Sequence, residues 1–359
     1  MKNYVLFAAI GAALLSGCAT APAISNAPVT PVSDAMAKPV KTVYPAPSEI
    51  VAAAPVADWV AIAQSDLLVM ELLADAEGKT RRVVIQLMPA PFSQSWVGNI
   101  RKLAAAKFWD GTSVNRVQDN YVVQWGDATE KKVLPEGLEV VPESDYLTTF
   151  EDKMFATVWS IQGRIKIPYP AYIPAPVFGE ESKPMFSDPY TSTVGFVGGF
   201  PVGISETYLP AEKPEDMLSF PDVLFPTHCY GMVGVGRNLS PDTGTGAELY
   251  TVIGHAPRHL DRNIAVVGRV IEGIEHLSSL PRGTGALGFY ESEAERTPII
   301  SVRIGNDASD LPAFEYLSTE SDSFAAYADA RANRRDPFFN VPAGGADICN
   351  IPVPVRRRG

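Results

Sequence analysis

Two blocks of short apolar runs, on either side of a long irregular segment, limit what this 359-residue chain can fold into. The first block contains two β-rich runs, 66–73 (DLLVMELL) and 81–88 (RRVVIQLM), joined by the turn-like sequence ADAEGKT. The later stretch 113–127 (SVNRVQDNYVVQWGD) reads as two further strands around a polar turn. Before that stretch, Ser93 is placed to cap a helix over 93–106, in which apolar residues recur at helical spacing. The first block therefore predicts four strands and one helix.

The second block, Gly231 to Leu280, is ordered in the same way. Strands are expected at 231–237, 247–254, 264–270 and, after the block, 297–305. A helix is predicted over 270–280, because Pro281 would end it there. With the first block, these runs indicate a mainly β fold.

The segments between and after the two blocks show little periodicity. Residues 128–228 are dense in proline, tyrosine, phenylalanine and acidic residues, and their aromatic content argues against disorder. We therefore expect an insertion of loops and short strands packed on the main body. The C-terminal extension, residues 306–359, is expected to hold a short helix over 324–335 and an extended end.

The first eighteen residues are typical of an export signal, with Lys2 ahead of an apolar run too short to span a bilayer. Their end, Leu-Ser-Gly-Cys at Cys18, resembles the lipobox of bacterial lipoproteins, which implies a lipidated cysteine. Ala19 follows in place of the aspartate that retains such proteins in the inner membrane, so an outer-membrane anchor facing the periplasm is implied. The alternative is a soluble secreted protein with an incidental Cys18. Residues 19–58, rich in alanine and proline, are expected to form an extended tether.

Charge and cysteine content narrow the class of protein further. The formal net charge of −11 argues against a nucleic-acid-binding surface, because such a surface needs a basic face. Beyond Cys18, only Cys229 and Cys349 remain. In an oxidising compartment they can form a disulfide that ties the end of the chain to its middle. Two separately buried free cysteines are the alternative.

Arg116 and Gln124 lie inside runs that otherwise read as packed strands. Burying either side chain without a partner costs roughly 1–3 kcal/mol. These groups therefore either reach water or line a pocket. A purely structural alternative for Arg116 is an ion pair with a carboxylate such as Asp127 or Glu248.

In their order along the chain, the two blocks resemble the cyclophilin-type peptidyl-prolyl isomerases. The first, 82–127, matches the family's strand, helix and arginine strand, including WDGT at 109–112 and QWGD at 124–127. The second, 231–280, places GTGAELYTVIG where the family has Gly-Ser-Gln-Phe-Phe-Ile. The resemblance implies a closed antiparallel β-barrel of about eight strands, capped by two helices, within a domain spanning 59–305.

The resemblance also implies which residues act. Arg116 matches the family's catalytic arginine, and Gln124 matches the glutamine beside it. The implied substrate-binding residues are Tyr121, Val122, Gly236, Arg237, Glu248, Tyr250, His259, Leu260 and Ile264. Among them, Gly236 and Arg237 match a pair whose backbone contacts the residue before proline. The implied partners are proline-containing polypeptides.

Arginine suits this chemistry on physical grounds. An X-Pro amide isomerises slowly, because rotation breaks resonance across a barrier of ~18–20 kcal/mol. At the twisted transition state the proline nitrogen regains a lone pair, so a donor placed there binds that state better than the planar ones. Arginine stays charged and presents fixed donors. We therefore expect a peptidylprolyl isomerase that assists folding in the cell envelope and needs neither a metal nor a cofactor.

Several positions depart from the family's pattern. Glu248 stands where a second glutamine is usual, and its carboxylate is placed to pair with Arg116. His259 and Ile264 replace a tryptophan and a histidine on the rim, and Trp125 is expected to put a bulky ring near the site. The alternative function is a catalytically weak or inactive module that binds proline-containing chains or an envelope partner.

Three other patterns in the sequence give little indication of function. The glycine-rich stretch 234–246 lacks the Lys-Ser/Thr pair of a phosphate-binding loop and leads into a strand. Gly198 and Gly199 are expected to form a tight turn. Four histidines lack metal-ligand spacing and are expected to be satisfied or surface residues: His228, His255, His259 and His276.

Overall fold

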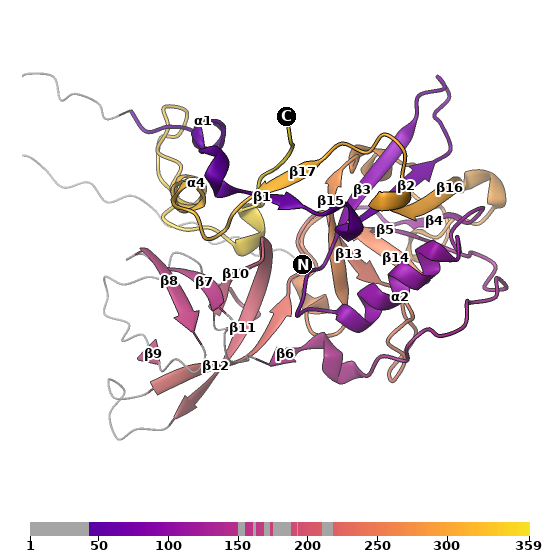
Figure 1. The fold of residues 1–359 in the computed structure, drawn as a ribbon, viewed down its shortest axis with the longest axis horizontal. Coiled ribbons are helices and arrows are strands. Elements are labelled where there is room, and N and C mark those ends of the chain that lie inside the picture. Colours follow the sequence, from indigo (N-terminus) through magenta and orange to yellow (C-terminus); the bar gives the residue numbers. More distant parts are fainter. Residues whose placement is uncertain are drawn as a thin grey trace, which may run out of the picture. The chain divides into compact units, whose positions relative to one another are not determined.

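The computed structural model describes residues 43–149, 155–160, 163–168, 173–174, 188–191, 193–209 and 218–359 (Figure 1). The predicted export signal, Cys18 and the first part of the predicted tether lie outside these residues. Within the described ranges, no helix combines the length and the apolar character needed to cross a membrane.

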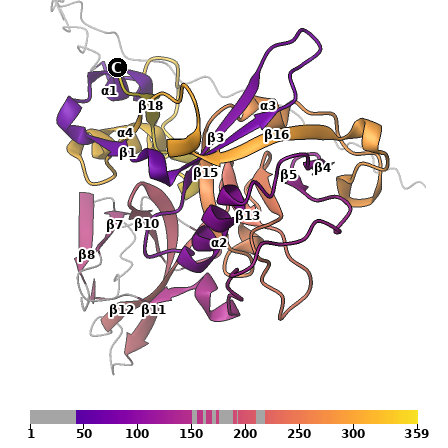
Figure 2. The ribbon, with the colours of Figure 1, turned by 45° about the vertical axis from the view of Figure 1, so that its right-hand side comes forward.

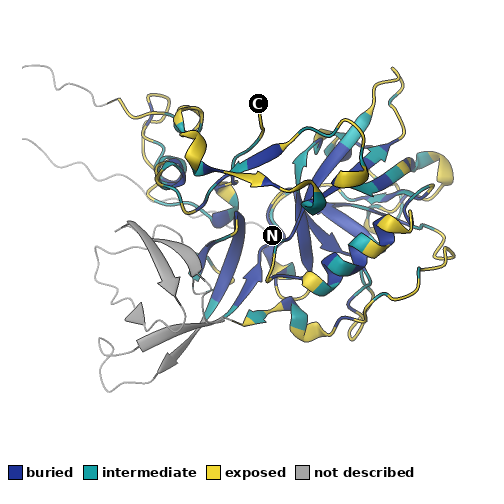
Figure 3. Cartoon of the chain, viewed as in Figure 1, coloured by how far each residue is buried: buried dark blue, intermediate teal, exposed yellow. Residues whose placement is uncertain are grey.

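Eight antiparallel strands close into a barrel in the order β13-β14-β5-β4-β16-β2-β3-β15. They are β2 (Leu67–Leu72), β3 (Arg81–Leu87), β4 (Ser113–Val117), β5 (Val122–Gly126), β13 (Met232–Val235), β14 (Leu249–Val252), β15 (Val266–Glu272) and β16 (Thr297–Ile304). Each strand overlaps a run predicted from the sequence, and Figure 3 shows these strands largely buried. The predicted mainly β fold with a closed barrel is confirmed.

Helix α2 (Gln94–Ala105) packs its apolar face into the core. Trp96, Ile100 and Leu103 are fully buried, as their helical spacing predicts. Ser93 occupies the N-cap position, but its side chain makes no cap hydrogen bond. The predicted side-chain cap is therefore wrong. The reason is the left-handed backbone of Ser93, with φ at 54°, whereas a capping side chain normally comes from an extended residue.

The second predicted helix, 270–280, is shorter than expected. Strand β15 continues to Glu272 and pairs with β3, so only α3 (Glu275–Ser278) is helical. Gly273 turns the chain between the two elements with a φ of 82°. The apolar run before Gly273 fits a buried strand as well as a helix, so its spacing could not distinguish the two.

Residues 128–228 hold a seven-stranded sheet, called here the insertion sheet (Figures 1 and 2). Its strands are β6 (Thr148–Thr149), β7 (Phe155–Ser160), β8 (Gly163–Pro168), β9 (Ile173–Pro174), β10 (Thr193–Val197), β11 (Phe200–Leu209) and β12 (Leu218–Pro226). Five of these strands are short, as expected, but β11 and β12 span ten and nine residues, longer than the sequence led us to expect. Gly198 and Gly199 form the predicted tight turn between β10 and β11, both with positive φ.

The C-terminal extension builds a second, smaller sheet with the residues ahead of the barrel. Strand β17 (Phe314–Leu317) lies between β1 (Trp59–Ile62) and β18 (Val355–Arg357), and α4 (Asp322–Ala332) corresponds to the predicted short helix. Residues predicted as extended tether instead form α1 (Pro47–Ala53). At the start of α1, the Glu49 side chain accepts a hydrogen bond from the Ala46 backbone N–H. The sequence did not predict this helix, because seven residues are too few to show a helical period.

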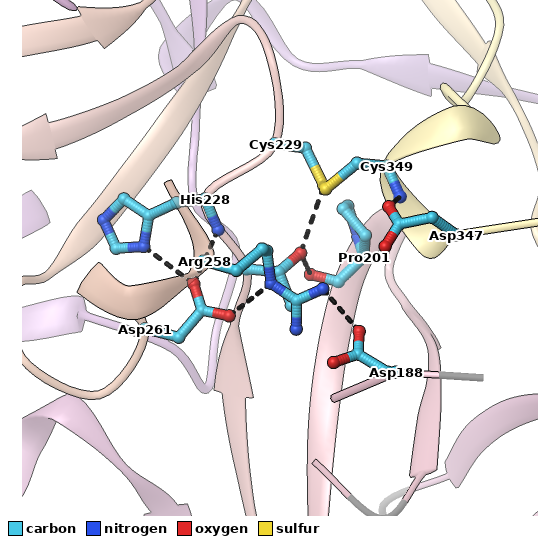
Figure 4. The surroundings of a disulfide bond; sticks show 9 residues. Asp188, Pro201, His228, Cys229, Arg258, Asp261, Asp347 and Cys349 are labelled. Atoms are coloured by element: carbon cyan, nitrogen blue, oxygen red, sulfur yellow. Dashed lines mark hydrogen bonds and ion pairs between the residues drawn. A yellow bond between two sulfur atoms is a disulfide. The ribbon is translucent and has the colours of Figure 1, made fainter. Parts of the chain in front are cut away.

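A disulfide joins Cys229, which lies between β12 and β13, to Cys349 in the C-terminal extension (Figure 4). Of the two alternatives for these cysteines, the structure contains the disulfide. It ties the extension to the start of β13.

Candidate active site

Three side chains form a row across neighbouring barrel strands. Arg116 on β4 lies opposite Gln124 on β5, and Gln124 lies opposite Tyr250 on β14. Residues directly opposite each other in an antiparallel pair point to the same face of the sheet. Val123 precedes Gln124 and belongs to the main core, so the row faces outward from the barrel.

A bulge in β4 aims Arg116 outward. Val114 pairs with Trp125, and both are buried in the core. On a regular strand Arg116, two residues further on, would point to the core as well. The register shifts between Val114 and Arg116, which leaves Asn115 as the extra residue. Bulges re-aim side chains in this way next to active sites.

Trp125 does not lie beside the site. Its side chain is fully within the barrel core, so the expectation of a bulky ring near the site was wrong. Side chains alternate along β5, and because Gln124 faces outward, Trp125 must face inward.

An apolar cluster lies on the same outer face as the row. Val122, Tyr250 and Val252 are buried together, and Tyr121 and Ile264 pack against them. This cluster is separate from the main core. It offers an apolar surface to a ligand beside the polar row.

The row and the cluster line one cavity of about 530 Å³. The predicted site residues that line it are Arg116, Tyr121, Val122, Gln124, Gly236, Arg237, Glu248, Tyr250, Leu260 and Ile264. His259 lies next to the cavity, with its ring stacked on Tyr121 at 6.4 Å between centroids. Of the described residues in 128–228, only Ala128 and Glu130 contribute to the lining.

The guanidinium of Arg116 is held by neutral acceptors. Its Nε donates to the Leu287 carbonyl at 2.8 Å and its Nη1 to Gln124 Oε1 at 2.9 Å. Its Nη2 donates to Gln118 Oε1. Three of its five N–H donors are thus engaged within the described part of the chain. Gln118 and Leu287 were missed from the sequence, and Leu287 lies 171 residues away with no pattern that links it to Arg116.

Two aromatic rings flank this guanidinium. Its carbon lies 5.7 Å from the ring centre of Tyr121 and 5.2 Å from that of Phe289. Burial lowers the pKa of Arg116 below its usual value, and the nearby Tyr121 and Glu248 oppose that shift. Arg116 therefore remains a cation in a partly dry site, where electrostatic interactions are stronger than in water.

The carboxylates that were candidates to neutralise Arg116 have other partners. Glu248 Oε1 accepts a hydrogen bond from Asn115 Nδ2 at 3.0 Å. Asp127 accepts backbone N–H groups of the turn that follows it. Although burial opposes the shift, these hydrogen bonds lower the pKa of Asp127. Among the described residues, neither carboxylate forms an ion pair with Arg116, so the structural alternative is not realised.

Gly236 and Arg237, whose backbone is predicted to contact the substrate, lie at another edge of the cavity. The Gly236 N–H donates to the Glu248 carbonyl at 2.8 Å. The Arg237 guanidinium donates to the Asn263 carbonyl through Nε and Nη2. The role of this pair in contacting a substrate stays a prediction. In the described part of the chain, no three His, Cys, Asp or Glu side chains gather so as to hold a metal ion.

Tyr250 has a buried partner that the sequence did not reveal. Its hydroxyl lies 2.8 Å from His228 Nε2. His228 was expected to be a satisfied or a surface histidine, and it is completely buried. It lies on the segment before β13, and no motif spacing connects it to Tyr250.

The closed barrel and its arginine row define a class of protein, and a comparison of the sequence with protein families agrees. The family described as cyclophilin type peptidyl-prolyl cis-trans isomerase/CLD matches residues 75–304. This match begins after β2, covers the other seven barrel strands from β3 to β16, and includes the insertion sheet. The chain belongs to this family and is a peptidyl-prolyl isomerase.

A solved cyclophilin structure shows the same fold. The cyclophilin AquaCyp293 from Hirschia baltica is similar with a TM-score of 0.57 and 20% identity, covering 83% of this chain and 92% of its own. A cyclophilin type isomerase from Cryptosporidium parvum, solved in the presence of the dipeptide Ala-Pro, has a TM-score of 0.32 and 12% identity, covering 66% of this chain and 98% of its own. No curated protein sequence matches the chain.

Proposed function

We propose that this isomerase acts on X-Pro bonds of proteins in the bacterial cell envelope, with Arg116 stabilising the twisted amide. The observation that carries the proposal is the outward row of Arg116, Gln124 and Tyr250 beside an apolar cluster. The cluster can hold the pyrrolidine ring, while the guanidinium stands beside the amide to be rotated.

The contacts of Arg116 fit this role. Gln124 and the Leu287 carbonyl fix the guanidinium at two nitrogens. A donor fixed in advance stabilises developing electron density without reorganising during the reaction. When the amide twists, the proline nitrogen regains its lone pair and accepts from this donor, whereas the planar amide offers no such acceptor. Arg116 thus binds the transition state better than either isomer.

We also propose that lipidated Cys18 anchors the chain to the outer membrane, with the fold in the periplasm. The export signal and lipobox-like end of residues 1–18 support this location. The disulfide between Cys229 and Cys349 supports it too, because disulfides persist in oxidising compartments.

Substitution of Arg116 tests the mechanism. In a protease-coupled assay on a peptide with one Ala-Pro bond, we expect Arg116→Ala to lower kcat/KM about 100-fold, as when other transition-state donors are removed. Arg116→Lys should recover little, because a lysine cannot keep the forked contacts. Arg303→Lys is the matched control, since Arg303 pairs with Asp110 and does not line the cavity.

Equal activity of Arg116→Ala and wild type would overturn the mechanism. A wild-type protein that binds the peptide without isomerising it would instead favour the binding module, in which the altered rim retains recognition alone.

Substitution of Cys18 tests the anchor. In the organism that makes the protein, we expect the full chain to take up a labelled fatty acid and to sediment with outer membranes. Cys18→Ala should abolish both, since an alanine carries no thiol to acylate. A labelled Cys18→Ala variant, or an unlabelled and soluble wild type, would contradict the proposed anchor.

A further inference from the structure

Five buried polar side chains connect the cavity to the insertion. Tyr250 Oη lies 2.8 Å from His228 Nε2, and His228 Nδ1 lies 2.9 Å from Asp261 Oδ1. Arg258 Nε donates to Asp261 Oδ2 at 2.5 Å, and Arg258 Nη1 donates to Asp188 Oδ2 at 2.5 Å. Figure 4 shows His228, Asp261, Arg258 and Asp188 linked in succession. We call these five residues the buried chain.

Every member of the buried chain is closed to water. The side chains of His228, Asp261, Arg258 and Asp188 are between 1% and 3% exposed, and Tyr250 is 5% exposed. Burying charged groups is costly unless each keeps its partners, and loss of one partner leaves the next uncompensated. Such a chain therefore holds its members in one arrangement.

The direction of the hydrogen bonds follows from the chemistry of each group. Asp261 Oδ1 accepts both the backbone N–H of His228 and its ring Nδ1–H. In the neutral ring, Nε2 is then left with its lone pair and accepts from the Tyr250 hydroxyl. Burial raises the pKa of Tyr250 well above its usual value, so this hydroxyl keeps its proton. Burial acts to lower the pKa of Arg258, but its two carboxylate partners raise it overall.

The ring of Tyr250 is fixed from two sides. It stacks on the His228 ring with 6.2 Å between centroids and 10° between planes. Opposite it on β13 lies Gly234, where a Cβ would overlap the phenolic end of Tyr250. The glycine at this position is what lets the tyrosine lie flat toward His228. Tyr250 in turn forms part of the apolar cluster in the cavity.

The buried chain also supports a second wall of the cavity. Leu260, which lines the cavity, lies between Arg258 and Asp261 in sequence. These two residues point back into the buried chain and hold the loop that carries Leu260. At the insertion end of the buried chain, Asp188 accepts a hydrogen bond from Arg258 and also accepts the Tyr190 N–H at 2.8 Å. The Tyr190 ring covers the Arg258 guanidinium at 5.4 Å.

We infer that His228 and Asp261 are positioning residues that fix Tyr250 and Leu260 in the proline pocket, and that Asp188 makes the insertion part of this support. The inference rests on the proposed function of the cavity as that pocket. It gives the insertion a role in binding proline-containing peptides, although the insertion sheet contributes no strand to the barrel. Because the buried chain acts on the pocket and not on Arg116, its loss should raise KM and leave kcat nearly unchanged.

A double-mutant cycle tests the link between His228 and Tyr250. His228→Asn keeps a polar group near the Asp261 carboxylate but cannot reach Tyr250, so we expect KM to rise about tenfold. In a Tyr250→Phe background the same substitution should raise KM less than about twofold, because the hydroxyl that His228 contacts has been removed. His228→Gln, whose amide reaches the depth of Nε2, should recover most of the affinity.

An equal rise in KM from His228→Asn in both backgrounds would overturn the inference. A fall in kcat with KM unchanged would overturn it too. If His228→Asn does not fold, Tyr250→Phe tests the same link, because it removes the hydroxyl that lies against His228, and an unchanged KM in that variant overturns the inference.

Asp188→Asn tests the role of the insertion. This variant keeps an acceptor for the Tyr190 N–H but weakens the hold on Arg258, so we expect KM to rise about threefold or more. Asp110→Asn is the matched control, because it removes the same charge from an Arg–Asp pair, Arg303 with Asp110, that lies away from the cavity. Equal KM values in the two variants would overturn the role of the insertion.

The outcomes separate this inference from the proposed mechanism. Activity that depends on Arg116 but not on the buried chain would overturn the inference alone. If wild type binds the peptide without isomerising it, the mechanism fails, and the same variants are then compared by their peptide Kd in an NMR titration. If wild type neither isomerises nor binds the peptide, both fail.

Discussion

At the residue scale, Glu248 is the departure from the family that touches the site most directly. Its carboxylate is tied to Asn115, the bulge residue that turns Arg116 outward, and its charge helps to keep Arg116 protonated. Glu248 thus supports the geometry of the arginine strand while it weakens the pull of Arg116 on a substrate oxygen or nitrogen. We propose that Glu248 tunes the site and does not block it, because its carboxylate is held by Asn115.

Neutralising Glu248 separates these two effects. Glu248→Gln keeps an oxygen acceptor for Asn115 and removes the charge, so we expect kcat/KM on an uncharged Ala-Pro peptide to rise about two- to fivefold. The gain should shrink in high salt, because salt screens the charge that the substitution removes. Glu248→Asp is the companion variant that keeps the charge and shortens the reach. A fall in kcat/KM for Glu248→Gln would show that the charge assists catalysis.

Much of the site could be predicted from the sequence at this scale, and the reason lies in the order of short motifs. Arg116, Gln124 and Tyr250 were placed by their positions within two blocks, and the structure brings them together on one face. The inward direction of Trp125 follows from alternation along β5, but the bulge in β4 that turns Arg116 outward could not be predicted. Nor could the partner of His228, because hydrogen bonds across 22 or 33 residues leave no local pattern.

At the scale of elements, Arg269 on β15 joins three sheets. Its guanidinium donates to Gln86 on β3 and to the Gly199 carbonyl in the turn between β10 and β11. The rings of Phe200 on β11 and Tyr316 on β17 lie 4.6 and 5.7 Å from it. Burial lowers the pKa of Arg269 to about 10, and none of the described carboxylates forms an ion pair with it.

Loss of Arg269 should therefore loosen the contact between elements. We expect Arg269→Met to lower the free energy of unfolding by about 2–4 kcal/mol, because Gln86 Oε1 and the Gly199 carbonyl are left without their donor. The double variant with Gln86→Met should lose less than the sum of the single changes, since an apolar pair replaces a polar one. Urea denaturation measures both. Additive losses would contradict the coupling.

The same scale shows where prediction of elements succeeded and failed. All eight barrel strands were predicted, because a short apolar run bounded by turn residues is a local signal. The insertion sheet was not, since its long strands β11 and β12 pair through a register shift at Ser205 and contain prolines at 201, 221 and 226. The short helices α1 and α3 span seven and four residues, fewer than a helical period needs to show itself.

At the scale of the whole molecule, the segments outside the barrel are tied to it by shared apolar packing and by a disulfide. The insertion sheet shares the main apolar core with the barrel, and the C-terminal extension contributes Phe324 and Ile348 to the same core. The disulfide between Cys229 and Cys349 adds a covalent link across 120 residues of sequence. It fixes the segment that also carries His228, so the C-terminal extension and the wall of the cavity at Tyr250 share an anchor.

Removal of this disulfide should mainly lower the free energy of unfolding and should weaken substrate binding only slightly. A crosslink of this span restricts the unfolded chain, so we expect the double variant Cys229→Ser, Cys349→Ser to lose about 2–5 kcal/mol of unfolding free energy. The loss lowers Tm in a thermal melt, and a reducing agent should lower Tm of the wild type but not of the variant. Below Tm, KM should rise only slightly, because Asp261 still holds the backbone and the ring of His228. A variant with unchanged Tm but a large rise in KM would show that the disulfide, and not the buried chain, positions the pocket.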